Sequence, residues 1–306
     1  MLLKFRRNFD EMRNLQTFLD VRESLIHFLR EDIGIGDITS NIIISPNIMA
    51  RAKIICKTKE AAIVCGLEEA SIIFDICKCK PQMLVKDGSW VKKGTIVMNI
   101  VGKALYILKA ERTALNLIMR MSGIATETRS FINSISSYSN SVRIACTRKT
   151  APGLRFFDKK AVAIGGGDTH RMRLDDMVLI KDNHLFFSGS VEKSIKLARR
   201  NVGSSAKIEC EVRTLKDAIG AINAGATIVM LDNFSPREVT EAIKEITKRG
   251  FRNKITLEVS GGITLQNVRY YAKAKPDIIS IGHLTHSPRA IDFSLEITKK
   301  IRNNRI

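Results

Sequence analysis

The second half of the chain alternates strand-like and helix-like segments, and this alternation limits its possible folds more than any other feature of the sequence. Helical patterns lie near residues 191–201, 214–224, 235–249 and 264–274. Six short apolar runs are predicted to form strands, at residues 142–146, 177–180, 207–212, 227–231, 255–259 and 277–281. Regular alternation of strands and helices is typical of parallel sheets, so two architectures fit: a (β/α) barrel and an open doubly wound sheet.

The ends of these six predicted strands are rich in charged residues, polar residues and glycines. In chain order they carry Arg148 and Lys149, Lys181 to His184, Glu209 and Glu211, Asp232 and Asn233, Ser260-Gly261-Gly262, and Gly282 with His283. Both candidate architectures form their sites at the carboxyl ends of strands. A closed ring of strands that converges on one mouth explains six such ends best, so the sequence favours the barrel.

Cations and glycines are concentrated between residues 146 and 184. The cations include Arg148, Lys149, His170, Arg171 and Lys181, which we call the cation cluster. A glycine-rich backbone lets side chains and amide groups close around a small anion. The segment could instead be a solvated basic loop, but the apolar run 177–180 predicts a buried strand that leads directly into Lys181. The cation cluster is therefore predicted to bind carboxylates or phosphates.

Two strand ends that contain glycine, Ser260-Gly261-Gly262 and Gly282-His283, come last in the predicted ring. Each precedes a helical pattern, and glycines at a helix N-terminus let backbone N–H groups approach phosphate oxygens. Barrels commonly bind a phosphate at this place. The sequence therefore predicts that a phosphoryl group binds here.

Two acidic residues, Glu211 and Asp232, are predicted to face the cation cluster across the mouth. Carboxylates in a phosphate-binding mouth usually hold sugar hydroxyls or a divalent metal, and Mg²⁺ bridged through substrate phosphates suits such oxygen ligands. They could instead simply pair with the lysines. Pairing and catalysis are compatible, so both interpretations stay open at this point.

The first half of the chain follows a different pattern. Short β-branched runs at 52–56, 61–64, 82–85 and 95–100 are predicted strands, with helices predicted at 15–29, 67–74 and 104–135. Because these elements do not alternate strictly, they predict a small α+β layer that forms a separate domain.

Composition narrows the class of protein. The chain has 306 residues, 44% of them hydrophobic, with 50 Lys and Arg against 31 Asp and Glu, which gives a formal charge of +19. This charge allows a nucleic-acid-binding protein as the alternative. The basic residues are spread along the chain and only 6% of residues are aromatic, which argues against a nucleic-acid partner. No apolar run approaches the ~20 residues of a membrane helix, no signal-peptide core is visible, and six cysteines lack a CxxC pair. We expect a cytoplasmic protein with reduced thiols and no membrane partner.

Seven ordered motifs in the second half carry a specific resemblance. They are TRKTAPGLR at 147–155, GGGDTHR at 165–171, LIKDNH at 179–184, ECEV at 209–212, MLDNF at 230–234, EVSGGI at 258–263 and ISIGHLTHS at 279–287. EDIGIGDITS, DGSWVKKGTIV and ERTALNLIMRMSGIAT at 31–40, 87–97 and 111–126 agree as well. The chain resembles quinolinate phosphoribosyltransferase, the nicotinate-nucleotide pyrophosphorylase (carboxylating) family, over nearly its whole length.

This resemblance implies an α/β fold with an incomplete (β/α) barrel preceded by an α+β open sandwich domain. The sandwich domain would cover residues 1–122, joined by a C-terminal helix at 288–306, and the barrel residues 123–287. The implied reaction joins quinolinate to phosphoribosyl pyrophosphate, requires Mg²⁺, and gives nicotinate mononucleotide, pyrophosphate and CO₂ in de novo NAD synthesis. A homodimer or a higher oligomer of dimers with shared active sites is implied as well.

The resemblance also implies residue roles. Around quinolinate it places Arg112, donated by a neighbouring subunit, with Arg148, His170, Arg171 and Lys181. Lys149 and Lys181 would face the pyrophosphate, Glu211 and Asp232 the ribose and metal, and Ser260, Gly261, Gly262 and Gly282 the 5′-phosphate, with His283 beside them. Lys149, Lys181, Glu211 and Asp232 would be the catalytic residues.

Two positions depart from the usual pattern of the family. Ala151 stands where threonine is common, and Asp168 lies just before the His-Arg pair where a small residue is frequent. We expect Asp168 to add a negative charge beside a carboxylate pocket, which bears on affinity and leaves the reaction class unchanged.

Overall fold

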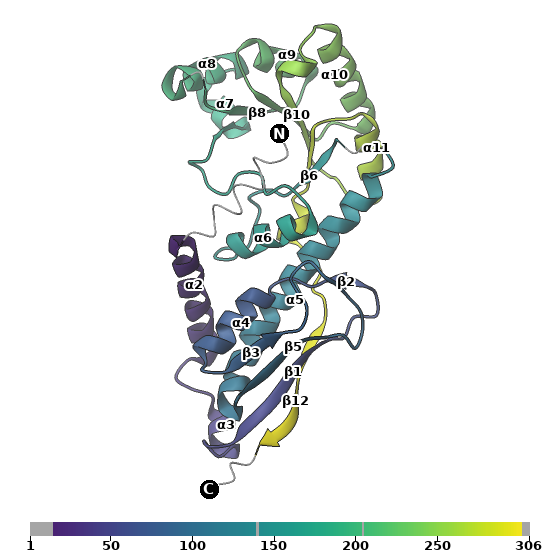
Figure 1. Ribbon diagram of the computed structural model, residues 1–306. Coiled ribbons are helices and arrows are strands. Elements are labelled where there is room, and N and C mark those ends of the chain that lie inside the picture. The colour runs from purple at the N-terminus through teal and green to yellow at the C-terminus, as the bar shows by residue number, and fades with distance from the viewer. Residues whose placement is uncertain (1–14, 139–140, 204, 302–306) are drawn as a thin grey trace. The chain divides into compact units, whose positions relative to one another are not determined.

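The computed structural model describes residues 15–138, 141–203 and 205–301 of the chain (Figure 1). These residues belong to two compact units. The first unit comprises residues 1–127, 152–165 and 288–306, and the second comprises residues 128–151 and 166–287. In the described part of the chain, no helix is both long enough and apolar enough to cross a membrane.

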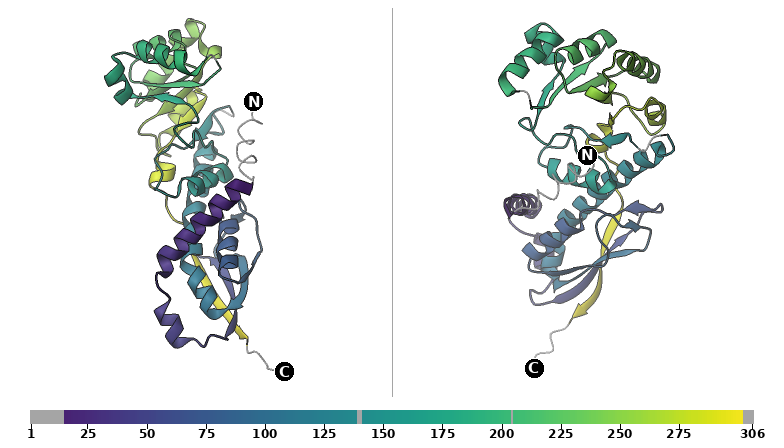
Figure 2. Two further views of the ribbon diagram at one scale, coloured as in Figure 1. Left: turned by 90° about the vertical axis from the view of Figure 1, so that its left-hand side faces the viewer. Right: turned by 45° about the horizontal axis from the view of Figure 1, so that its top comes forward.

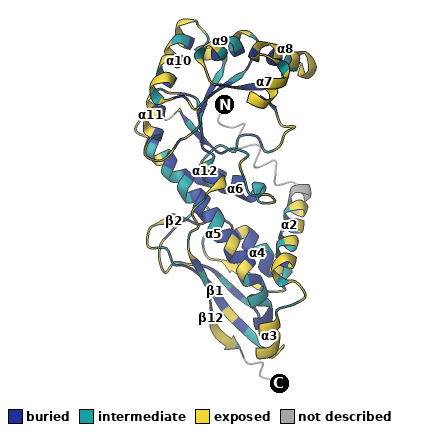
Figure 3. Ribbon diagram, turned by 180° about the vertical axis from the view of Figure 1, so that it is seen from behind, coloured by how far each residue is buried: buried dark blue, intermediate teal, exposed yellow. Residues whose placement is uncertain are grey.

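The first unit is built on an antiparallel sheet of four strands. Their order is β12 (Phe293–Ile301), β1 (Met49–Cys56), β5 (Ile96–Lys103) and β3 (Lys80–Met83). The other elements are α2 (Leu15–Ile33), α3 (Ile38–Ile43), the strand pair β2 (Ala62–Ile63) and β4 (Trp90–Val91), α4 (Leu67–Ile76), α6 (Arg155–Gly165) and most of α5 (Ala104–Ile135). Figure 3 shows buried residues along β1 and α5, in keeping with a core between sheet and helices. The α+β layer predicted for the first half is confirmed.

The expected C-terminal helix at 288–306 is wrong in the described residues. Residues 293–301 form strand β12, which runs antiparallel to β1 with Ile54 opposite Leu295. The run FSLEIT suits a strand, because it is rich in β-branched and aromatic residues and Phe293 is buried. A helix here would leave the hydrogen-bonding groups on one side of β1 without a strand. Residues 302–306 lie outside the described residues.

The second unit is built on a parallel sheet of six strands, as the alternation predicts. The strands are β6 (Arg143–Ala145), β7 (Val178–Ile180), β8 (Ile208–Val212), β9 (Ile228–Asp232), β10 (Thr256–Ser260) and β11 (Ile278–Ser280), in the order β6-β11-β10-β9-β8-β7. Each lies within or next to one of the six predicted runs. The ring is not closed by strand pairing, because β6 and β7 are the two edges of the sheet. The result is an incomplete barrel.

Helices separate the strands of the second unit. They are α7 (Asp182–Ser188), α8 (Val191–Val202), α9 (Leu215–Asn223), α10 (Pro236–Lys248), α11 (Val268–Lys273) and α12 (His283–His286), with a short 3₁₀ helix at Arg252–Lys254. Figure 2 shows the green helices of this unit on the outer side of the strands. Residues at their N-termini favour helix formation. Ser235 caps α10 in a capping box with Glu238, Pro236 lies in the first turn of α10, and Thr214 caps α9.

One helix breaks the alternation. α6 lies between β6 and β7 in the sequence but belongs to the first unit, and the sequence did not predict it. Its charged residues are paired there: Asp158 accepts two hydrogen bonds from Arg120 of α5, and Lys160 donates to Glu68 and Glu69 of α4. β6 is therefore followed in the sequence by a helix that belongs to the first unit.

Candidate active site

A cavity of about 470 Å³ lies at the carboxyl ends of the parallel strands. Side chains reach it from alternate positions, as expected for one face of a sheet. Leu179 and Lys181 come from β7 and its end, Glu211 from β8, Met230 and Asp232 from β9, Glu258 and Ser260 from β10, and Ser280 from β11. The inward face of each strand therefore becomes polar toward its end, which gives the cavity a hydrophilic lining.

The whole cation cluster lines this cavity, as Arg148, Lys149, His170, Arg171 and Lys181 all contribute to its surface. Arg171 is only 8% exposed, so its guanidinium is largely removed from water. Burial lowers the pKa of Arg171, and repulsion from Arg148 lowers it further. Two guanidinium groups that repel each other in a nearly dry site make a strong attractor for an anion.

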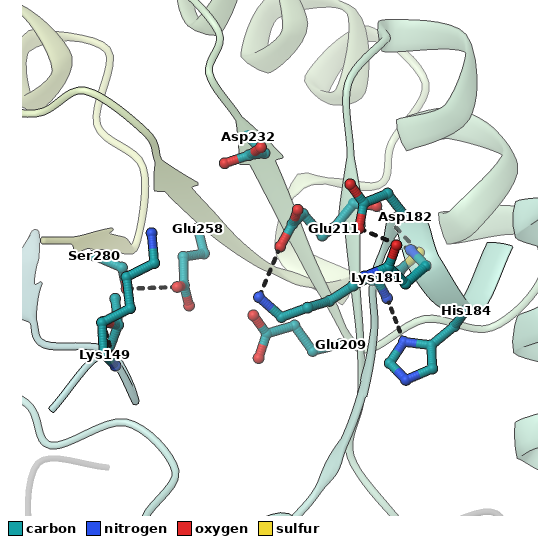
Figure 4. Close-up of polar contacts among 12 residues, drawn as sticks. Lys149, Lys181, Asp182, His184, Glu209, Glu211, Asp232, Glu258 and Ser280 are labelled. Atoms are coloured by element: carbon teal, nitrogen blue, oxygen red, sulfur yellow. Dashed lines mark hydrogen bonds and ion pairs between the residues drawn. The ribbon is translucent and has the colours of Figure 1, made fainter. Parts of the chain in front are cut away.

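Acidic residues face these cations. The Lys181 Nζ donates to Glu211 Oε2 at 3.1 Å, and Figure 4 shows this ion pair below Asp232 at the next strand. Asp232 accepts a hydrogen bond from the Asn233 side chain at 2.7 Å. The pairing expected as the alternative role for Glu211 is therefore present, and both carboxylates still reach the cavity.

His170 lies between two buried glutamates. Its Nε2 is 3.3 Å from Glu209 Oε2 and 3.3 Å from Glu258 Oε2, and neither glutamate is exposed. Burial by itself lowers the pKa of His170, but its interactions with the Glu209 and Glu258 carboxylates outweigh burial and raise the pKa to about 10. The two carboxylates therefore favour the protonated form of His170.

The glycine-containing end of β10 forms a tight backbone turn. Gly261 and Gly262 have φ of +98° and +59°, a region that favours glycine. A Cβ on Gly261 would lie 2.2 Å from the side-chain oxygen of Asn233. The Asn233 N–H donates to the Ser260 carbonyl at 2.8 Å, so the loops after β9 and β10 are joined at this turn. Such a turn leaves room for a ligand to approach the backbone closely.

Of the thirteen predicted site residues, ten line the cavity and three do not. Gly282 nevertheless lies against it, because a Cβ added there would be 3.2 Å from Cδ of Lys149. His283 is exposed and packs edge-to-face on His286. Arg112 lies on α5 in the first unit, where it is exposed. The structure thus brings ten residues together, while the ligand that each one contacts stays a prediction.

The sequence prediction missed Glu258 and Ser280 as cavity residues. Both belong to strands whose ends were predicted to form the site, and Glu258 lies two positions before Ser260. Because side chains two positions apart share a strand face, this spacing was a usable signal. Asp168 does not line the cavity: its carboxylate forms an ion pair with Arg143, so the expected extra charge beside the pocket is balanced locally.

Two groups of side chains could hold a divalent metal. Glu211 and Asp232 offer oxygen ligands at the ends of adjacent strands. Among the described residues, His170, Glu209 and Glu258 also bring ligand atoms within 4.8 Å of one another. Only the first group consists of oxygen donors alone, the type that Mg²⁺ prefers.

Comparison with known proteins decides the family. The profile of the quinolinate phosphoribosyl transferase C-terminal domain matches residues 124–296, and that of the N-terminal domain matches residues 37–122. The chain belongs to the quinolinate phosphoribosyltransferase family. The resemblance seen in the sequence motifs is thereby confirmed.

Relatives within this family are similar over most of their length. A probable nicotinate-nucleotide pyrophosphorylase (carboxylating) of Methanocaldococcus jannaschii is 46% identical over 273 residues, 89% of this chain and 95% of that protein. The human nicotinate-nucleotide pyrophosphorylase (carboxylating) is 35% identical, covering 79% of this chain and 81% of that protein. The solved nicotinate-nucleotide pyrophosphorylase of Francisella tularensis superposes with a TM-score of 0.82 at 36% identity, covering 91% and 96% of the two chains. The incomplete barrel and the separate antiparallel domain are the fold of this family.

Proposed function

We propose that the protein is a nicotinate-nucleotide pyrophosphorylase (carboxylating), a pentosyltransferase. It transfers the phosphoribosyl group of phosphoribosyl pyrophosphate to quinolinate, with loss of CO₂, and so forms nicotinate mononucleotide and pyrophosphate for de novo NAD synthesis. One observation supports this most strongly: in a member of this family, the cation cluster and two carboxylates meet at a single cavity with a glycine turn. That combination suits a dicarboxylate and a phosphorylated sugar at once.

Quinolinate carries two carboxylates on adjacent carbons of a pyridine ring. Arg148, His170 and Arg171 offer two guanidinium groups and an imidazolium in a partly dry site. Guanidinium binds carboxylate through two parallel hydrogen bonds, which fixes the plane of the ring as well as its position. Positioning of this kind removes much of the entropic part of the barrier to a reaction between two molecules.

Phosphoribosyl pyrophosphate would occupy the remaining part of the cavity. The turn Ser260-Gly261-Gly262 would hold the 5′-phosphate through backbone N–H groups, and Lys149 and Lys181 would attract the pyrophosphate. Asp232 and Glu211 would then lie beside the ribose. Negative side chains would then lie at the sugar and positive side chains at the leaving group.

The reaction follows from where charge develops. As the bond between ribose C1 and the pyrophosphate oxygen breaks, C1 becomes positive, and Glu211 and Asp232 stabilise that charge. The pyridine nitrogen then forms a bond with C1. The carboxylate beside the nitrogen leaves as CO₂, its bonding electrons enter the positively charged ring, and a proton takes its place. The residues of the cavity contribute position and electrostatics.

Mg²⁺ is the proposed cofactor. Glu211 and Asp232 are 12% and 14% exposed in their side chains and already interact with Lys181 and Asn233, so they do not form a complete oxygen cage. They fit an ion that is shared with substrate phosphates. When bound, Mg²⁺ offsets negative charge on the leaving pyrophosphate.

A dimer with shared sites, or a higher oligomer of such dimers, is part of the proposal. Arg112 is exposed on α5 and is not among the residues that line the cavity. An isologous two-fold interface would let each subunit donate Arg112 to its partner. We further propose a cytoplasmic location, in keeping with six free cysteines.

Release of labelled CO₂ tests the proposed reaction. Quinolinate labelled in the carboxyl group beside the ring nitrogen is incubated with the protein and Mg²⁺, with and without phosphoribosyl pyrophosphate. We expect CO₂ release that requires phosphoribosyl pyrophosphate and equals the nicotinate mononucleotide formed. CO₂ release without phosphoribosyl pyrophosphate, or no release with it, would refute the proposal.

A further inference from the structure

Two of the most deeply buried charges in the second unit have no role in the proposed reaction. Glu209 and Glu258 are 0% exposed, and they approach each other from β8 and β10 on the two sides of β9. Figure 4 shows the Glu258 side chain between Lys149 and Lys181, and the Glu209 carboxylate below the end of the Lys181 side chain. A buried carboxylate is costly unless it is paired, so a pair of them in one place requires an explanation.

The His170 ring is the group that these carboxylates share. Its Nε2 lies 3.3 Å from an oxygen of each. Neither oxygen of Glu209 has a hydrogen-bond partner among the described residues, so the ion pair with this ring is the contact that offsets its buried charge. Glu258 also accepts a hydrogen bond from the Ser280 hydroxyl through its other oxygen, which fixes the orientation of that carboxylate.

The backbone of His170 is also fixed by neighbouring residues. His170 has φ of +52°, a left-handed conformation that is uncommon for residues other than glycine and costs free energy. Asp168 stabilises it, because its Oδ1 accepts the His170 N–H at 2.8 Å while its Oδ2 pairs with Arg143. Asp168 is also bridged to Ala145 at the free edge of β6, so the loop carrying His170 is attached to the sheet.

The charges around His170 explain why two carboxylates are present. Arg148 and Arg171 already repel each other, and an imidazolium beside them increases the repulsion before any substrate binds. The Glu209 and Glu258 carboxylates lie within ion-pair distance of His170 and can offset part of this repulsion, although burial raises the pKa of Glu209. The two carboxylates thus allow three cations to stay together in the absence of an anion.

We propose that Glu209 and Glu258 are positioning residues that hold His170 as a fixed imidazolium against the quinolinate subsite, with Asp168 holding its backbone. The proposal rests on the proposed function for the identity of the substrate, but the state of His170 in the ligand-free protein does not. The carboxylates act through His170 and require no contact with the substrate.

A metal ion bound by the same three residues is the competing interpretation. Metal binding requires a neutral His170 nitrogen directed at the ion. It would also place a divalent cation beside Arg171 and Arg148, where the electrostatic repulsion is already high. A protonated ring within 3.3 Å of both carboxylates offsets their charge without this cost, so the ion-pair geometry favours the protonated ring.

Histidine NMR of the ligand-free protein tests the proposal directly. The chain contains five histidines, so ¹⁵N-histidine labelling gives few signals, and His170→Asn identifies the signal of His170. We expect both ring nitrogens of His170 to be protonated at pH 8 in the wild-type protein. In Glu209→Gln/Glu258→Gln the ring should be neutral at pH 8, while Glu241→Gln, an exposed glutamate of α10, should leave it protonated.

Kinetics give the second measurement. Removing the carboxylates should lower kcat/KM for quinolinate by about 10–100-fold, the range typical of residues that orient a ligand-binding side chain. The KM for phosphoribosyl pyrophosphate should change little, which a general loss of structure would not allow. If the double variant does not fold, Glu258→Gln alone and Ser280→Ala should give smaller effects in the same direction.

Three results would overturn the proposal: a neutral His170 in the wild-type protein at pH 8, a protonated His170 in the folded double variant, or a stoichiometric metal in the purified protein that is lost in that variant. Absence of wild-type quinolinate turnover would refute the proposed function and leave the NMR result standing.

Discussion

At the scale of single residues, the chemistry depends on where each charge lies relative to water. Arg171 is 8% exposed and Glu209 and Glu258 are 0% exposed, whereas Lys149 is exposed at the rim. A charge contact in a dry site is worth more than the same contact in water. We therefore expect substitutions at the buried positions to have larger effects than substitutions at the rim.

Loss of a cation from the cavity should remove most of the activity. For Lys181→Ala and Arg171→Ala we expect a decrease in quinolinate turnover of about 10²–10³-fold, the cost of losing one preorganised charge contact. Lys244→Ala, an exposed lysine on α10, is the matched control and should retain activity. Circular dichroism should show that all three fold. Near-normal kinetics for both cavity variants would contradict the site assignment.

The glycine turn after β10 allows a prediction that distinguishes loss of stability from loss of phosphate binding. Gly261→Ala places a Cβ 2.2 Å from the Asn233 side-chain oxygen and 2.8 Å from its backbone nitrogen. Gly250→Ala is the control, because Gly250 also has a positive φ of +73° but has nothing within 4 Å of an added Cβ. Both should lose about 1 kcal/mol of stability or more. Only Gly261→Ala should raise the KM for phosphoribosyl pyrophosphate, roughly tenfold for about 1.4 kcal/mol of lost phosphate binding. Equal KM values for both variants would exclude a role of this turn in binding.

At the scale of elements, the start of α4 shows how a buried carboxylate supports a helix. The N-cap residue Gly66 has no side chain to accept a hydrogen bond, and Asp87 accepts the Leu67 N–H instead at 2.9 Å. Burial raises the pKa of Asp87 to about 6, against the lowering effect of the Leu67 hydrogen bond and of Lys160. The folded protein therefore holds a proton on Asp87 that the unfolded chain has already released between about pH 4 and pH 6.

Stability should consequently fall as pH rises through this window. Asp87→Asn keeps an oxygen for the Leu67 N–H and removes the titration, so the variant should gain stability relative to wild type between pH 4 and pH 7. A shift of about two pKa units corresponds to at most about 3 kcal/mol. Urea unfolding at several pH values measures the difference in unfolding free energy between variant and wild type. Asp75→Asn, at an exposed position on α4, is the control. A difference in unfolding free energy that does not depend on pH would contradict the assignment.

At the scale of the whole molecule, the open question is how many chains complete one site. Arg112 is assigned to quinolinate by resemblance, yet it belongs to the first unit and is absent from the residues that line the cavity. Donation by a second subunit, as proposed above, would resolve this difference. It also predicts that two inactive variants can restore activity in each other.

Mixing Arg112→Ala with Lys181→Ala after reversible dissociation tests this prediction. In a mixed dimer the chain that carries Arg112→Ala keeps its own Lys181 and receives an intact Arg112, so one of two sites is complete. Random pairing makes about half of the dimers mixed, and activity should return to about a quarter of wild type. Each variant mixed with itself is the control. No recovery after verified subunit exchange would mean that Arg112 acts within its own chain or has a structural role.

Features that local patterns encode could be predicted before the structure was known. The six parallel strands follow from short apolar runs between capped helices, and ten of the thirteen predicted site residues line one cavity because parallel strands all present their carboxyl ends at the same edge. The family followed from motifs of a few consecutive residues. In each case the decisive information lies within one segment of the chain.

Features that depend on contacts between distant segments became visible only in three dimensions. Residues 293–301 form a strand because β1 offers an edge far earlier in the chain, and α6 belongs to the first unit because Arg120, Glu68 and Glu69 pair with its charges there. Glu209 and Glu258 flank His170 only through the strand order, and Asp168 supports it only because Arg143 lies beside it. Pairing and burial are properties of neighbours in space, and the spacing of residues along a chain does not specify them.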